Sequence, residues 1–200
     1  MENVGLDLEQ RDALGEMSNI SMGSSATALS ALLMNRRVEI TTPQVEVIRR
    51  SEALDDYDHT CILVHINYIK GLEGSNILLL KEEDVMRITD MMMGGDGNTV
   101  VGDMTELHLS AVSEAMNQMM GSAATALAKL LNRSIDISPP KTEHIDVDSI
   151  KIFEKLFASP EKDMVKVTFK LTIGDCIDSS MVQLYPLELA RQLVEYFYVR

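Results

Sequence analysis

The sequence predicts an α+β fold made of two related halves, in which an antiparallel sheet carries two long helices on one side. Three observations lead to this prediction. A helical segment occurs twice, alternating apolar residues with short turns follow each copy, and each half ends in a further helical segment. Strands joined by short turns favour antiparallel pairing, and helices flanking them favour one covered face. We therefore expect residues 1–200 to form one pseudo-two-fold domain with repeats of about 6–97 and 104–198.

The duplicated helical segment covers residues 12–33 and 110–131. Aligned without gaps, the two copies are identical at twelve of 22 positions. Such self-similarity at a fixed spacing is the sign of an internal repeat rather than of two unrelated helices. The identical positions include three pairs of interest: Glu16 with Glu114, Asn19 with Asn117, and Gly23 with Gly121.

The strands repeat in the same order after each copy. VEITTP at 38–43 parallels IDISPP at 135–140, once a single extra residue near Met34 is allowed. Alternating apolar residues then predict strands at 62–66 and 165–173, each followed by a glycine-containing turn and another strand. The order of elements is therefore the same in both halves.

A shorter helix closes each half. The predicted ranges are about 83–93 and 186–197, with Pro186 as the first helical residue, where no amide hydrogen is needed. The boundary between the halves falls near the GGDGN segment at 94–98, without a long linker. We therefore expect the halves to be fused into one unit.

Composition places the chain among soluble proteins and argues against several partners. Apolar residues make up 46% and charged residues 24%, and no run of about 18 apolar residues predicts a membrane span. The first residues lack the regions of a secretion signal. The formal charge of −13 argues against nucleic acid or anionic lipid as the main partner. Cys61 and Cys176 stand far apart without a CxxC pattern, so reduced thiols in the cytoplasm fit better than a disulfide.

A polar stripe runs along each predicted long helix. At 100° per residue, four residues of each copy fall within roughly 60° of one another, opposite the small and apolar residues that face the sheet. The stripe of the first helix consists of Asp12, Glu16, Asn19 and Gly23, and that of the second of Ser110, Glu114, Asn117 and Gly121.

An exposed Glu and Asn three residues apart is by itself weak evidence of function. Such pairs commonly belong to a solvated helix face, and Glu73 and Asn76 have the same spacing in a predicted turn. However, asparagine is unfavourable inside helices, and glycine there costs about 1 kcal/mol relative to alanine. Because both halves keep both residues, we expect a surface that a partner's backbone approaches closely. A second interpretation is that Gly23 and Gly121 allow tight helix packing within the domain.

Several common kinds of catalytic site find no support in the sequence. Ser110 has no histidine nearby, and the four histidines, at 59, 65, 108 and 144, lack metal-ligand spacing, so neither Ser–His catalysis nor a metal site is predicted. No glycine-rich phosphate loop of the usual patterns occurs. The polar stripes remain the candidate site.

The stripes resemble the signature of a known family, the CheC, CheX and FliY phosphatases. In that signature, Asp or Ser precedes an E-x-x-N motif, and a proline follows further along the chain. Flanking segments such as SNISMGSSATALSALL, GSNILLLKEED and MMMGGDG are similar to FliY members in particular. The resemblance covers nearly the whole chain. The signature occurs twice, as Asp12-Glu16-Asn19 with Pro43 and as Ser110-Glu114-Asn117 with Pro140.

The resemblance implies a CheC-like fold and a protein phosphatase that hydrolyses the aspartyl phosphate of the chemotaxis response regulator CheY. It places the chain at the flagellar switch, in the cytoplasmic ring, near FliM, FliG and FliN-like proteins, without nucleic acid or membrane insertion. No cofactor of this chain is implied, because Mg²⁺ is expected on the regulator. The implied catalytic residues are Glu16, Asn19, Glu114 and Asn117, and the implied partner contacts are Asp12, Gly23, Pro43, Ser110, Gly121 and Pro140.

An amide and a carboxylate suit this chemistry, because the regulator supplies a metal ion and a lysine beside a reactive acyl phosphate. The Asn side chain can hold the attacking water in line with the phosphorus. The Glu side chain, one turn earlier, can pair with the lysine and fix the docking register. General-base catalysis by Glu is a less favoured role.

The sequence departs from the family pattern in two respects. Asn19 and Pro43 are separated by one residue more than Asn117 and Pro140, which leaves the role of Pro43 open. FliY proteins also carry an N-terminal CheY-binding segment and a C-terminal FliN-like domain, which are not found here. We therefore expect an isolated central domain or, failing that, a stand-alone CheC relative. Two further hypotheses are a non-catalytic CheY-binding scaffold of the motor and a phosphatase regulated by CheD.

Overall fold

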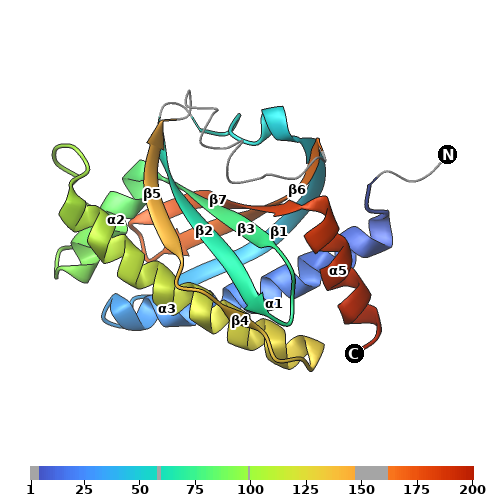
Figure 1. Cartoon of the computed structure of the whole chain (residues 1–200). Helices are drawn as coiled ribbons and strands as arrows, with labels where there is room; N and C mark the ends of the chain where they lie inside the picture. Colours follow the sequence, from blue (N-terminus) through green and yellow to red (C-terminus); the bar gives the residue numbers. More distant parts are fainter. Residues whose placement is uncertain (1–4, 58–59, 99, 147–161) are drawn as a thin grey trace.

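The computed structural model describes residues 5–57, 60–98, 100–146 and 162–200. It confirms the predicted α+β class, because an antiparallel sheet carries the four α-helices of the described chain on one face (Figure 1). Among the helices of the described ranges, none has the length and apolar character of a membrane span. His59 lies outside the described residues.

Each half follows the predicted order of helix, strands and helix. The structure corrects one detail, because Pro186 is the N-cap of the last helix rather than its first helical residue. The first half contains α1 (Leu8–Leu32), β1 (Val38–Arg49), the 3-10 helix η1 (Arg50–Glu52), β2 (Thr60–Lys70), β3 (Ser75–Lys81) and α2 (Glu82–Met92). The second half contains α3 (Glu106–Leu131), β4 (Asp136–Ile137), β5 (Lys141–Asp146), β6 (Asp163–Ile173), β7 (Ile177–Pro186) and α5 (Leu187–Tyr198).

The strands of the two halves interleave in the sheet. Its order is β1-β6-β7-β3-β2-β4, with β5 also paired to β2. β1 of the first half pairs with β6 of the second, and in the same way β5 of the second half pairs with β2 of the first. β3 and β7, which are equivalent strands, meet in the middle. Each half therefore needs strands of the other to complete its share of the sheet.

The two long helices pack against each other through equivalent serines. The hydroxyl oxygens of Ser24 and Ser122 lie 2.6 Å apart, and the Ser122 hydroxyl also donates to the Ser24 carbonyl at 3.1 Å. These residues are 98 positions apart, which is the offset of the sequence repeat, so the pseudo-two-fold axis passes between them. The symmetry is not complete, because Ser25 donates to the Met119 carbonyl at 2.8 Å while its counterpart is Ala123.

Both long helices also begin at equivalent caps, four residues before the ranges expected from the sequence. The Asp7 carboxylate accepts from the backbone N–H of Gln10 at 2.8 Å, and the Gln10 side chain accepts from the backbone N–H of Asp7 at 2.9 Å. Thr105 caps α3, and its backbone N–H donates to Nδ1 of His108 at 3.0 Å. Such caps satisfy backbone donors that the first turn leaves unpaired, and they fix where each helix starts.

The main core lies between the helices and the sheet. Apolar side chains of all four helices and of the facing strand positions form one cluster there. A smaller cluster on the opposite face of the sheet includes Tyr57, Cys61 and Val182. Burial raises the pKa of the Cys61 thiol to about 12, so this cysteine is an inert core residue rather than a nucleophile.

Candidate active site

The structure exposes both predicted polar stripes. Asp12, Glu16 and Asn19 are exposed on α1, while Leu14 and Met17 point into the core. On α3 the exposed residues are Ser110, Glu114 and Asn117. The two glycines that end the stripes are partly exposed, Gly23 on α1 and Gly121 on α3.

The two stripes lie on opposite sides of the helix crossing. In Figure 1, α1 begins near α5 and α3 begins near α2, and the helices cross between these ends. Each Glu–Asn pair precedes the crossing serine of its own helix. The domain therefore presents two separate candidate sites rather than one composite site.

The first stripe borders an open groove between α1 and β1. Asp12, Glu16 and Asn19 form its helical side, and Pro43 and Val45 come from the strand. The groove has a volume of about 380 Å³. The structure thus brings together four of the residues predicted for the first site. Leu8, Arg11 and Gly15 complete the lining.

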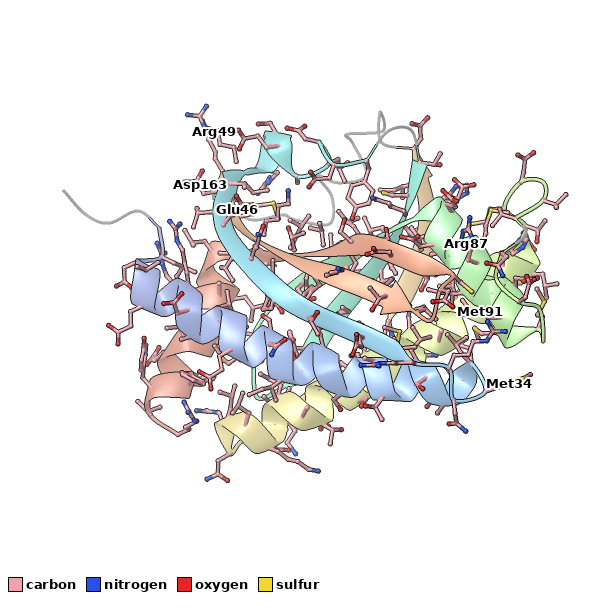
Figure 2. The ribbon with its side chains drawn as sticks, turned by 180° about the vertical axis from the view of Figure 1, so that it is seen from behind. Met34, Glu46, Arg49, Arg87, Met91 and Asp163 are labelled. Carbon is pink, nitrogen blue, oxygen red and sulfur yellow. The ribbon has the colours of Figure 1, made fainter. Side chains whose placement is uncertain are left out.

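The extra residue before Pro43 is taken up where α1 turns into β1. Met34 and Asn35 both adopt left-handed backbone conformations, with φ of 57° and 61°, whereas Asn132 alone does so after α3, with φ of 49°. Figure 2 shows Met34 at the end of α1. Because the insertion is confined to this turn, it does not displace Pro43 from the groove.

A proline interrupts strand pairing at both sites. In β1, the pairing with β6 shifts between Thr41 and Gln44, next to Pro43. In the second half, the corresponding stretch is divided into β4 and β5, with Pro140 between them. Proline lacks the backbone N–H that a continuous ladder needs, so each interruption has the same physical cause.

The second site differs in its side chains. The Glu114 carboxylate accepts a hydrogen bond from the Gln118 amide at 3.1 Å, an interaction that the counterpart of Gln118, Ile20, cannot make. Leu109 stands where the first site has Arg11, and it packs partly buried against the core. The two sites therefore share their Glu–Asn pair but not its surroundings.

The glycines of the stripes make no close contact with another element of the described chain. A methyl group added at Gly23 or at Gly121 would meet no atom within 4 Å apart from its own helix backbone and chain neighbours. This result contradicts the interpretation that these glycines allow close contact between elements of this chain. The open space fits a surface kept free for an approaching partner.

The end of α5 lies beside the start of the first site. Partial burial raises the pKa of the Tyr198 hydroxyl, and the carboxylates of Glu9, Asp7 and Asp12 raise it further. These carboxylates make the entrance to the groove acidic. Within the described ranges, no three His, Cys, Asp or Glu side chains gather as a metal-binding group.

Sequence reasoning did not find Leu8, Arg11, Gly15 and Val45 as groove residues. Their counterparts in the second half are different residue types, so the repeat gave no signal for them. For Arg11 and Gly15, helical periodicity did offer a signal. These two residues are four positions apart, so they share one helix face, and each directly precedes a residue of the stripe. The strand wall that faces them becomes visible only in the structure.

The chain is similar to a known family and to curated proteins. The model of the CheC-like family matches residues 9–47 and 107–144, which contain both stripes and both prolines. The flagellar motor switch phosphatase FliY of Bacillus subtilis is 50% identical over 92% of this chain, which spans about half (48%) of that protein's length. The CheY-P phosphatase CheC of the same organism is 28% identical over 68% of this chain and 67% of its own length.

A solved structure has the same fold as this chain. The crystal structure of Thermotoga maritima FliY matches with a TM-score of 0.90 and 41% sequence identity. The match covers 97% of this chain and 98% of that one, so it includes both halves and both candidate sites. The chain therefore belongs to the CheC-like family, in the group of the FliY proteins.

Proposed function

We propose that this domain is a protein phosphatase that hydrolyses the aspartyl phosphate of the response regulator CheY. The observation that carries the proposal is the pair of exposed Glu–Asn stripes at equivalent places, one of which borders a groove with its proline. The relatives support it, because FliY of Bacillus subtilis is named a phosphatase and CheC a CheY-P phosphatase.

In the proposed reaction, a water molecule held by the amide of Asn19 or Asn117 attacks the phosphorus. The bond between phosphorus and the aspartyl oxygen breaks, the regulator's carboxylate leaves as an anion, and both water protons end on inorganic phosphate. The amide oxygen accepts a hydrogen bond from the water, which orients the water's lone pair along the line of attack. Exposure of both amides is required, because the acyl phosphate arrives on another protein.

Glu16 and Glu114 are proposed to dock the regulator rather than to remove a proton. A carboxylate one turn before the amide can pair with a lysine beside the acyl phosphate, and such charge-assisted contacts fix orientation. Asp12, Ser110 and the two prolines would border the partner, and the open space at Gly23 and Gly121 would admit its backbone. We propose that Mg²⁺ comes with the regulator.

The same proposal places the domain at the flagellar switch. The relative that is 50% identical is named a flagellar motor switch protein. We propose that the domain acts at the cytoplasmic ring of the motor, near FliM, FliG and FliN-like proteins, where it would meet its substrate. The chain spans about half of that relative, so contacts of the relative with the motor can also involve the part outside the matched span.

The experiment that tests the proposal is phosphate release from phosphorylated CheY with Mg²⁺, using catalytic amounts of the domain. Wild type should accelerate release, and the Asn19→Ala, Asn117→Ala double variant should lose nearly all of the acceleration, a loss of at least about a hundredfold. Binding of the double variant to phosphorylated CheY serves as the control for folding and docking. Stoichiometric binding without turnover by wild type would instead identify a non-catalytic scaffold, and acceleration only with CheD would identify a regulated phosphatase.

A further inference from the structure

Ile20 is a large apolar side chain that stands exposed in the middle of α1. It is 41% exposed and lies midway between Leu8 and Leu32, the ends of that helix. The other exposed large apolar side chains of the described chain lie at the ends of helices and strands or in the connections between them. Single apolar residues on a surface are ordinary, so the significance of Ile20 depends on what surrounds it.

Ile20 belongs to the surface that carries the first Glu–Asn pair. It directly follows Asn19, and it lies one helical turn after Glu16 and one turn before Gly23, so it is a neighbour of both on the helix surface. The space beside Gly23 is open, because a methyl group there would meet no atom within 4 Å apart from its own helix backbone and chain neighbours. Ile20 is part of neither apolar cluster of the described residues. The described chain therefore leaves the outer side of Ile20 uncovered.

A protein that delivers an acyl phosphate to Asn19 must also cover Ile20. Consecutive Cα atoms are about 3.8 Å apart, whereas each side of a specific protein interface buries about 800 Å² and takes in roughly 20–30 residues. An apolar side chain so close to the reacting group loses its contact with water in such a complex. This burial stabilises the complex if the partner offers an apolar surface, and it costs free energy if the partner places an unpaired polar group there.

The second site has a different kind of residue at this position. The counterpart of Ile20 is Gln118, which directly follows Asn117 and whose amide donates a hydrogen bond to the Glu114 carboxylate at 3.1 Å. The two sites repeat the Glu–Asn pair but place an aliphatic side chain next to it in one half and an amide in the other. Such a difference changes which partner surface fits and leaves the residues proposed for the reaction unchanged.

We propose that Ile20 is a specificity-determining contact of the first site, which packs against an apolar side chain of the regulator beside the aspartyl phosphate. The inference rests on the proposed function, since it assumes that the regulator docks on the first stripe. Ile20 touches neither the phosphoryl group nor the attacking water, so it stabilises the ground state and the transition state alike. Such uniform binding lowers KM and leaves kcat nearly unchanged.

The kinetic test isolates the first site in the Asn117→Ala background. There, Ile20→Gln, which copies the second site, should raise KM for phosphorylated CheY about fivefold, with kcat within about a factor of two. Ile20→Val should keep KM within about a factor of two, because most of the apolar contact remains. The matched control is Ile69→Gln, since Ile69 is 63% exposed at the end of β2, outside both stripes. An unchanged KM in Ile20→Gln, or an equal rise in Ile69→Gln, would overturn the proposal.

The reciprocal substitution tests the same contact as a gain, which a loss of folding cannot produce. In the Asn19→Ala background, Gln118→Ile should have a KM for phosphorylated CheY about threefold lower than that of Gln118→Ala. Both variants remove the hydrogen bond to Glu114, so the comparison reports the apolar contact alone. Equal KM values would show that the regulator presents no apolar surface at this position, which contradicts the proposal.

A binding test separates this inference from the phosphatase activity itself. With the second site blocked by Glu114→Lys, CheY activated by beryllofluoride, a stable mimic of the acyl phosphate, should bind Ile20→Gln about fivefold more weakly than its parent. The ratio should be the same at low salt and at about 0.5 M salt, because an apolar contact is not screened. A ratio that falls to one at high salt would identify an electrostatic effect and overturn the proposal. Binding without turnover by wild type would refute the phosphatase and leave this test in force, whereas turnover with unchanged binding by Ile20→Gln would refute the Ile20 contact alone.

Discussion

The regions around α1 and α3 start from the same scaffold and end with different surroundings. Both helices begin at equivalent caps, cross at equivalent serines and expose the same Glu–Asn pair. The strand opposite α1 is continuous and bulged, whereas the stretch opposite α3 is split into β4 and β5. The residues at the site walls differ as well, with Arg11 in the first half and Leu109 in the second. After duplication the two halves kept the Glu–Asn pair and the helix crossing, while the residues around each pair diverged on the helices as well as on the strands.

The largest effect is expected from separating the two halves. A chain cut between Gly102 and Asp103 should give two fragments that do not fold alone, because β1 pairs with β6 and β5 with β2 across the halves. Mixing or co-expressing the fragments should restore cooperative thermal unfolding, which circular dichroism can follow. A cooperative transition in either fragment by itself would show that the halves are independent units, and the interleaved sheet would then not be essential.

The next largest effect is expected from removing the side-chain amides of Asn19 and Asn117. Asn19→Ala should remove more than half of the turnover of phosphorylated CheY and Asn117→Ala less than half. The reason is that the first site borders an open groove, while the Gln118 amide donates a hydrogen bond to the Glu114 carboxylate at the second site. Initial rates of phosphate release at limiting substrate measure the difference. Abolition of turnover by Asn117→Ala alone would show that the first site is idle.

A smaller effect is expected at Gly23 and Gly121, the glycines that both halves share. Gly23→Ala and Gly121→Ala should each increase the free energy of unfolding by about 0.5–1 kcal/mol, because alanine is the better helix former and its methyl group meets no neighbour. The same substitutions should weaken binding of phosphorylated CheY, since the methyl group occupies the space that a partner's backbone would need. Urea denaturation and titration with beryllofluoride-activated CheY measure the two effects. Added stability with unchanged binding would show that no partner comes close at these positions.

Much of the fold and of the stripes could be predicted because the repeat supplies an internal comparison. Glu16 and Asn19 stood out only because Glu114 and Asn117 repeat them, and their exposure follows from helical periodicity. The interleaving of strands could not be predicted, because pairing partners far apart in sequence leave no periodic signal. β5 lies at a sheet edge beside β2 of the other half, and its own sequence, KTEHID, does not alternate clearly.

The groove wall escaped prediction for a different physical reason. Arg11 is an ordinary residue in the first turns of a helix, and its place in the groove wall depends on the position of Leu6 and of β1. The position of Pro43 could also be established only from the structure, because a one-residue insertion can either be absorbed in a turn or shift a strand. Here it is absorbed at Met34, and the strand keeps its place at the groove.

The smallest effect is expected in the turn between α1 and β1, where the first half has one residue more than the second. Met34→Gly should raise the free energy of unfolding by about 1 kcal/mol, because a left-handed backbone is costly for a non-glycine residue. Met34 is 72% exposed, so little packing is lost. Asn132→Gly, in the matching turn, should gain less, since asparagine tolerates this conformation better. Urea denaturation of both variants measures the difference, and turnover by Met34→Gly should equal that of wild type because the turn lies away from the groove. An altered turnover would show that the extra residue does influence the position of Pro43.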